Sequence, residues 1–359
     1  MGIIRILLAL SVLLMHLPIV PNFTIAGSLA VPAFFIISGF YMGFILSEKY
    51  VGSNSYSLFI SNRFLRIYPL YWFVLLITLV LVLLKYFSHF GSDDNTISHF
   101  LILYKTVNPT LFILNLINYI SRNLTFLITA DYLIGFPASA GYWLIPQAWT
   151  LQVELLFYVI APLIVRLKFR TFMILISLYL LCKYLFIIKW QETNSHILLP
   201  AFLSFCEFFL LGILSYYLYS YMKRRDISKH ALLAVYILMI CLTLFYRQLP
   251  IPENLFGITD WFFYVVFASS IPMLFMFSKN KKADRLLGDL SYAVYITHFF
   301  IIKLMINTKL FIHLNIIYTS LFAIAATLCF SYLLTLFIEK PIDRYRQLRL
   351  KHKKEKNKR

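Results

Sequence analysis

The chain has 359 residues, of which 61% are hydrophobic and 13% are charged, and its mean hydropathy is +0.78. Soluble domains carry about 25% charged residues, so this composition excludes an ordinary soluble protein and predicts an all-α, polytopic integral membrane protein. The net charge of +18 could indicate nucleic-acid binding, but the basic residues lie between apolar segments and in the last twenty positions. That distribution is typical of positive-inside topology signals. We therefore expect contacts with membrane lipids and none with nucleic acid.

A hydropathy window of about 19 residues predicts ten transmembrane helices. They form one membrane domain, residues 1–338, followed by a basic cytoplasmic tail, residues 339–359. The basic clusters that connect the helices fall on one side if the count of ten is correct, so both termini are expected in the cytoplasm. The expected location is the cell membrane, inner or plasma, with multiple passes. The predicted spans are 3–20, 29–47, 67–87, 148–165, 171–189, 199–221, 230–246, 260–278, 288–306 and 314–337.

The connection at 88–147 is expected on the outer side, and its apolar part, 111–136, could add one or two helices. Polar residues within that part favour an interfacial or re-entrant segment over a lipid-facing span. They are Asn115, Asn118, Arg122, Asn123 and Asp131.

The four cysteines each lie alone in an apolar segment, without CxxC spacing. They are interpreted as small core residues, and no metal site is expected.

The first span contains two ionisable residues, Arg5 and His16. Eleven steps of about 100° bring them back to within about 20° of one helix face, about 16 Å apart along the axis. An ionisable residue inside a membrane segment costs at least a few kcal/mol, which makes both functional candidates.

Two arginines, Arg63 and Arg66, are neighbours at the start of the third span. They could be snorkelling anchors, or a phosphate clamp, because the planar guanidinium matches phosphate oxygens. Glu154 opens the fourth span and needs a partner. It could form a structural ion pair with an arginine, or orient His16 or a substrate hydroxyl.

The ninth span carries Ser291, Tyr292, Tyr295 and His298 at helical spacing. A lone histidine such as His298 is more often a hydrogen-bonded core residue than a catalyst.

Six segments, taken in order along nearly the whole chain, resemble the motifs of the membrane acyltransferase-3 family of bacterial glycan O-acetyltransferases. They are Arg5 and His16 with ten residues between them, 34–40 around Ser38, 63–71, 149–158 from Trp149 to Tyr158, 287–298 and 339–341. Two positions depart from the family pattern. Ile6 stands where a glycine often follows the arginine, and Thr150 stands where serine is common. Many members carry a C-terminal soluble esterase-like domain, which is not expected here because about twenty residues follow the last predicted span.

The resemblance implies transfer of an acyl group, usually acetyl from acetyl-CoA, to a hydroxyl of a surface polysaccharide such as O-antigen or capsule, or of its lipid-linked precursor. On this interpretation Arg5, Arg63 and Arg66 hold the anionic donor, and His16 acts as a general base or as a transient acyl carrier. Arg5 and Glu154 are further catalytic candidates. The remaining motif candidates are Ser38, Trp149, Tyr158, Ser291, Tyr292 and His298.

Two other classes share this helix count. A transporter or flippase of a glycan or lipid would contain buried charges, but no internal repeat is visible. A non-catalytic membrane scaffold would not require Arg5 and His16 on one face. Oligomeric state stays open, because Gly39 of the small-residue pair Gly39 and Gly43 belongs to a family motif.

Overall fold

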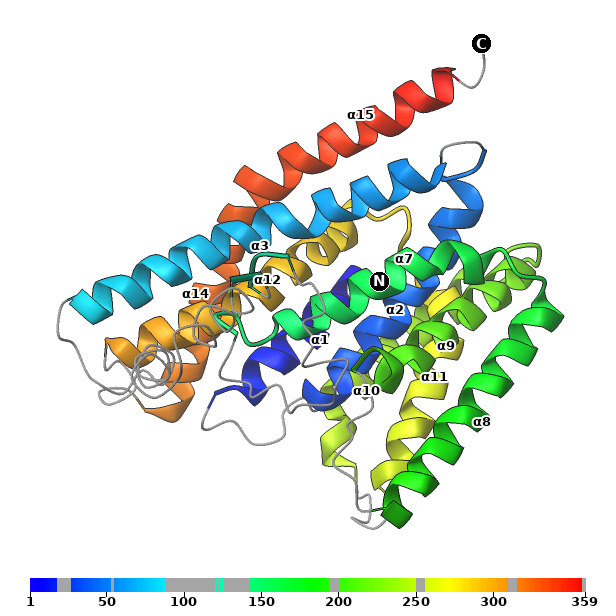
Figure 1. The fold of residues 1–359 in the computed structure, drawn as a ribbon, viewed down its shortest axis with the longest axis horizontal. Coiled ribbons are helices and arrows are strands. Elements are labelled where there is room, and N and C mark those ends of the chain that lie inside the picture. Colours follow the sequence, from blue (N-terminus) through cyan, green and yellow to red (C-terminus); the bar gives the residue numbers. More distant parts are fainter. Residues whose placement is uncertain are drawn as a thin grey trace.

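The computed structural model describes residues 1–17, 27–52, 55–87, 120, 121, 123–125, 143–193, 201–249, 256–308 and 315–356. Within these ranges all regular elements are helical (Figure 1). The first group comprises α1 (Gly2–Met15), α2 (Gly27–Glu48), α3 (Ser55–Phe87), α7 (Ala148–Val165) and α8 (Phe169–Thr193). The second comprises α9 (Ala201–Met222), α10 (Lys229–Phe245), the 3₁₀ turn η2 (Tyr246–Gln248), α11 (Phe256–Ser278) and α12 (Lys282–Asn307). The last comprises α14 (Ile316–Leu334), the π-helical turn η4 (Thr335–Glu339) and α15 (Lys340–Lys356).

Each of the ten predicted spans has a helical counterpart. Among the described residues, nine helices are long and apolar enough to cross a membrane, and α1 is apolar but has only 14 residues. The all-α, polytopic fold is therefore confirmed. The side on which each terminus lies stays a prediction, and the segment 111–136 lies mostly outside the described residues.

Two helices run well beyond their predicted spans. Helix α3 begins at Ser55, twelve residues before the predicted start at 67, and its 33 residues extend about 50 Å. The last predicted span continues through η4 into α15, which lies beside α3 (Figure 1). Both helices exceed the hydrocarbon core of about 30 Å. Hydropathy missed the start of α3 because Asn62, Arg63 and Arg66 interrupt its apolar sequence.

Close packing of α2 on α9 forms the centre of the molecule. A Cβ atom placed on Gly39 would lie 2.1 Å from the Phe209 carbonyl oxygen, and one on Gly212 would lie 2.1 Å from that of Ile36. The glycines thus allow the two backbones to meet, as small residues commonly do between membrane helices. Gly43 also faces α9, against Tyr216, so this small-residue pair is used within the molecule.

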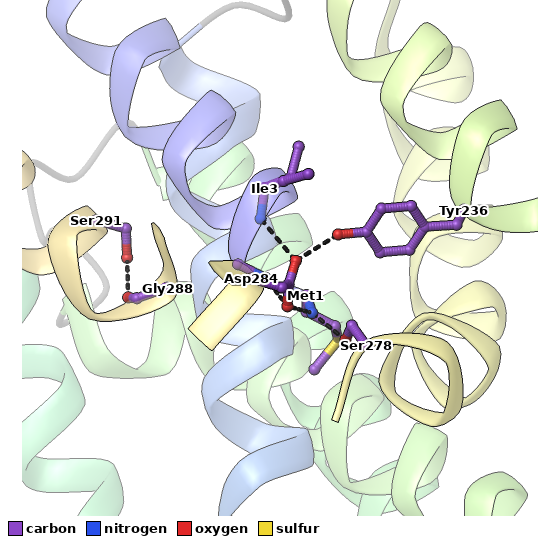
Figure 2. A network of polar contacts seen from close by, with 8 residues as sticks. Met1, Ile3, Tyr236, Ser278, Asp284, Gly288 and Ser291 are labelled. Atoms are coloured by element: carbon purple, nitrogen blue, oxygen red, sulfur yellow. Dashed lines mark hydrogen bonds and ion pairs between the residues drawn. The ribbon is translucent and has the colours of Figure 1, made fainter. Parts of the chain in front are cut away.

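Helix α1 is fixed against the start of α12 by Asp284 (Figure 2). Its carboxylate accepts hydrogen bonds from the backbone N–H groups of Gly2 (2.7 Å) and Ile3 (3.1 Å), and from the Tyr236 hydroxyl. A carboxylate at a helix N-terminus satisfies free N–H groups and complements the helix dipole. This anchor sets the register of α1 along α12.

Candidate active site

The Arg5 side chain lies against the backbone of α12. A Cβ atom built on Gly288 would stand 3.4 Å from Arg5 Nη1, so the glycine leaves room for the guanidinium. Arg66, Asp289 and Glu154 are the charged side chains that act on Arg5 electrostatically. Tyr41 of α2 also interacts with Arg5 electrostatically, so residues from four helices, α2, α3, α7 and α12, surround the arginine that the sequence singled out.

A charged cluster can be defined from these interactions. Its members come from α1, α3, α7, α12 and η4, and they are Arg5, Arg66, Glu154, Asp289 and Glu339. The Glu339 carboxylate accepts a hydrogen bond from the Thr335 hydroxyl (3.0 Å) within the π-helical turn. Such turns often occur at functional sites, because they redirect side chains from an otherwise regular helix.

Three arginines in and beside this cluster have unused donors. The side chains of Arg5, Arg63 and Arg66 form no hydrogen bond or ion pair with another described residue. Arg63 is only 8% exposed, and its Nε has no acceptor within the described part of the chain. A buried guanidinium without an acceptor costs free energy, which an anionic ligand would recover.

Arg63 also lines a cavity of about 640 Å³ between α3 and α7. Its Cζ atom lies 5.7 Å from the ring centroids of Phe59 and Tyr158, where cation–π attraction holds the side chain. The other lining residues are predominantly apolar or aromatic, including Trp72 and Leu155. The cavity therefore joins one cationic group to an apolar surface.

Glu154 is held by two hydroxyl groups. Its Oε1 accepts hydrogen bonds from Ser38 Oγ (2.8 Å) and from the Tyr158 hydroxyl. Among the described residues it forms no ion pair within 4.0 Å, although the charges of Arg5 and Arg66 act on it. The structure thus brings together three predicted site residues, Ser38, Glu154 and Tyr158.

His16 is stacked on His298, with ring centroids 5.5 Å apart and planes 18° from parallel. Phe299 covers the pair, with its centroid 4.4 Å from that of His16. His16 is half-buried, and His298 is fully buried. We call His16 and His298 the imidazole pair; the sequence predicted both residues but not their contact.

Within the imidazole pair, the His298 ring forms a hydrogen bond with a backbone carbonyl oxygen. His298 Nδ1 lies 2.7 Å from the Tyr295 carbonyl oxygen, and a carbonyl only accepts, so Nδ1 carries the proton. His298 Nε2 then holds the lone pair, and it has no partner in the described residues. Gln147 donates to the same carbonyl (3.3 Å) and to that of Ile296 (2.9 Å), which fixes this stretch of α12.

Arg5 of the charged cluster and His16 of the imidazole pair each lie beside a residue of α12. Arg5 lies beside Gly288, and His16 lies beside His298, so the helices run in the same direction. Eleven residues of α1 and ten of α12 separate them, about 16 Å of helix. The single helix face predicted for Arg5 and His16 is therefore the face that packs on α12.

The other predicted motif residues make packing contacts. The Trp149 ring packs at a tilt against that of Phe205, with centroids 5.3 Å apart. Ser291 donates to the Gly288 carbonyl oxygen (2.7 Å), and Tyr292 donates to that of Ile67 (2.8 Å). These bonds hold α12 in place and tie it to α3.

Sequence reasoning missed four polar residues at the site: Tyr41, Gln147, Asp289 and Glu339. The last two lie inside segments that carried the family resemblance, which was an available signal. Tyr41 directly follows the 34–40 segment, and Gln147 lies two residues before Trp149, so periodicity alone gave no reason to select them.

Comparison with known protein families identifies the family of this chain. The family model that describes an acyltransferase domain, acyltransferase-3, matches residues 1–336. No curated protein and no solved structure matches the chain. Because the family match covers nearly all of the membrane helices, the chain belongs to the acyltransferase-3 family and is a multi-pass membrane acyltransferase.

Proposed function

We propose that the protein is an O-acyltransferase that moves an acyl group from cytoplasmic acyl-CoA to a hydroxyl of a surface polysaccharide or its lipid-linked precursor. The proposed acyl group is acetyl. The observation that carries this proposal is the pairing of α1 with α12. Arginines with unused donors lie at one level, and two stacked imidazoles lie about 16 Å farther along. An anionic donor and a proton-transfer step require these two kinds of site.

Arg5, Arg63 and Arg66 are proposed to bind the acyl donor, acyl-CoA. Acyl-CoA carries phosphates, and arginine stays charged in a poor dielectric and pairs bidentately with phosphate oxygens. Since CoA is supplied from the cytoplasm, the charged cluster and the start of α1 face that side in this proposal. Both chain termini would then be cytoplasmic.

His16 is the proposed proton-handling group. The acceptor hydroxyl oxygen attacks the thioester carbonyl carbon, the carbon–sulfur bond breaks, and the imidazole passes the hydroxyl proton to the departing CoA sulfur. The buried His298 supports the His16 ring by stacking, and its own ring is fixed by the Tyr295 carbonyl. Alternatively, His16 carries the acyl group briefly as a nucleophile.

The test is acyl transfer by the purified protein in liposomes, with labelled acetyl-CoA added on one side. We expect the label on a glycan acceptor, and NMR of the cell-surface glycan should show O-acetyl groups only when the gene is present. Failure to bind acetyl-CoA would reject the proposal. Label retained on the protein without acceptor, and lost in His16→Ala, would favour the acyl-carrier route.

A further inference from the structure

Helix α15 carries a row of basic residues that faces the protein. Arg346, Arg349 and Lys353 are spaced three and four residues apart, so they share one face of the helix within about 60°. We call these three residues the basic row. Arg349 fixes the direction of this face, because it donates to Ser61 Oγ (2.8 Å) and Asn62 Oδ1 (2.9 Å) of α3. Figure 1 shows α15 lying along the N-terminal half of α3.

Within the basic row, the two residues on either side of Arg349 have buried donor atoms without a hydrogen-bond acceptor among the described residues. Arg346 is 9% exposed, and its Nε has no acceptor among the described residues. The Lys353 Nζ is likewise buried without a partner in the described part of the chain. Arg349 thus accounts for the docking of the helix, whereas Arg346 and Lys353 retain donors that packing does not explain.

The charges around Arg346 are mainly of its own sign. Arg66 and Arg63 act on it more strongly than the acidic Asp343 does. Asp343 accepts an ion pair from Arg346 (3.0 Å), but the Asp343 side chain is 50% exposed. Gathering like charges in a partly buried interface is unfavourable unless an anion compensates them.

We propose that the interface between α15 and α3 binds a phosphate ester, whose oxygens are held by Arg346 and Lys353. Phosphate suits this site because it offers several acceptor oxygens and a negative charge to guanidinium and ammonium groups. The CoA phosphates and the headgroup of an anionic phospholipid share this chemistry. The CoA source rests on the proposed function, since the same interface adjoins Arg63 and Arg66.

The first arm of the test measures the affinity of CoA for the purified protein in nanodiscs of neutral lipid. If the phosphate belongs to CoA, Arg346→Gln and Lys353→Gln each raise Kd about tenfold or more, as expected for loss of a charge-assisted hydrogen bond. Arg344→Gln and Lys351→Gln are the matched controls, because these basic residues lie on the exposed face of the same helix. They should change Kd less than about twofold.

The second arm measures phosphatidylglycerol retained by the purified protein, by native mass spectrometry. If the phosphate belongs to a lipid, retention falls in Arg346→Gln and Lys353→Gln, while the Kd for CoA stays unchanged. A thermal unfolding curve checks each variant. Lys353→Gln keeps the test valid if Arg346→Gln fails to fold, because Lys353 forms no bond that would be lost among the described residues.

The proposal is overturned if both ligands bind the two variants as they bind the wild type, or if the exposed-face controls lose as much. Neither arm measures acyl transfer. An inactive protein that binds CoA through Arg346 would refute the proposed function and leave this site standing. An active protein with unchanged binding would do the reverse.

Discussion

The charged cluster and the imidazole pair lie on the same two helices, yet they are built in opposite ways. The cluster gathers ionisable groups from five elements, and its arginines keep donors that no described residue uses. The imidazole pair is enclosed by Phe299 and backbone carbonyls, and no carboxylate or guanidinium of the described residues acts on either ring. The first arrangement suits binding of a charged ligand, and the second suits a neutral base.

This difference has a physical basis. A charged ligand must be matched by opposite charge when it leaves water, so its site needs several fixed cations. A histidine that accepts a proton near neutrality must start neutral, and apolar surroundings favour that form. One helix pair can therefore hold a donor at one level and transfer a proton at the other.

The largest expected effect comes from removing the His16 imidazole. His16→Ala should lower the acyl-transfer rate by about 10²- to 10⁴-fold, the usual contribution of a general base. The rate is measured in liposomes at saturating acyl-CoA. Met15→Ala is the control, because the neighbouring Met15 is 50% exposed. A His16→Ala protein that folds and transfers at the wild-type rate would remove the imidazole pair from the mechanism.

A smaller loss is expected at the charged cluster. Arg5→Gln should weaken acyl-CoA binding about 10- to 150-fold, since a hydrogen bond to a charged group contributes about 1.5–3 kcal/mol. Equilibrium binding to the purified protein measures this effect. Arg225→Gln is the matched control, because Arg225 is exposed and contacts Tyr221. Equal affinities for the two variants would show that Arg5 does not hold the donor.

Close packing on α9 holds α2, the helix whose Ser38 hydroxyl bonds to Glu154. Gly39→Leu places atoms where the Phe209 carbonyl oxygen lies, 2.1 Å from the new Cβ, and overpacking of this kind costs about 1–3 kcal/mol or more. The unfolding temperature in detergent should fall. Gly257→Leu should leave it unchanged, because nothing lies within 4 Å of a Cβ there. Similar unfolding temperatures would contradict the close α2–α9 contact.

The smallest effect is expected at Glu154. Tyr158→Phe removes one of the two hydroxyl groups that hold this carboxylate, a net loss of about 1 kcal/mol. The freed carboxylate competes for the arginines, so acyl-CoA affinity should drop about fivefold while the rate at saturating donor is kept. Tyr221→Phe, on the exposed surface, is the control. A lower rate with unchanged affinity would place Glu154 in the chemical step.

Much of the fold follows from hydropathy, because every predicted span has a helix. Hydropathy could not place the start of α3 or the course of α15, since their polar residues are accommodated by each other: Arg349 bonds to Asn62. Helical periodicity placed Arg5 and His16 on one face. It could not show that His298 of α12 stacks on His16. That contact depends on how α1 lies along α12, which the hydrogen bonds of Asp284 determine.

The division of labour along α1 is tested most directly by measuring the acyl-CoA Kd and the single-turnover transfer rate on Arg5→Gln and His16→Ala protein in the same liposomes. The account predicts that Arg5→Gln raises Kd and that His16→Ala lowers the rate with Kd unchanged. If His16→Ala weakens donor binding as much as Arg5→Gln does, or if both variants lower the saturated rate equally, the two groups do not have separate roles.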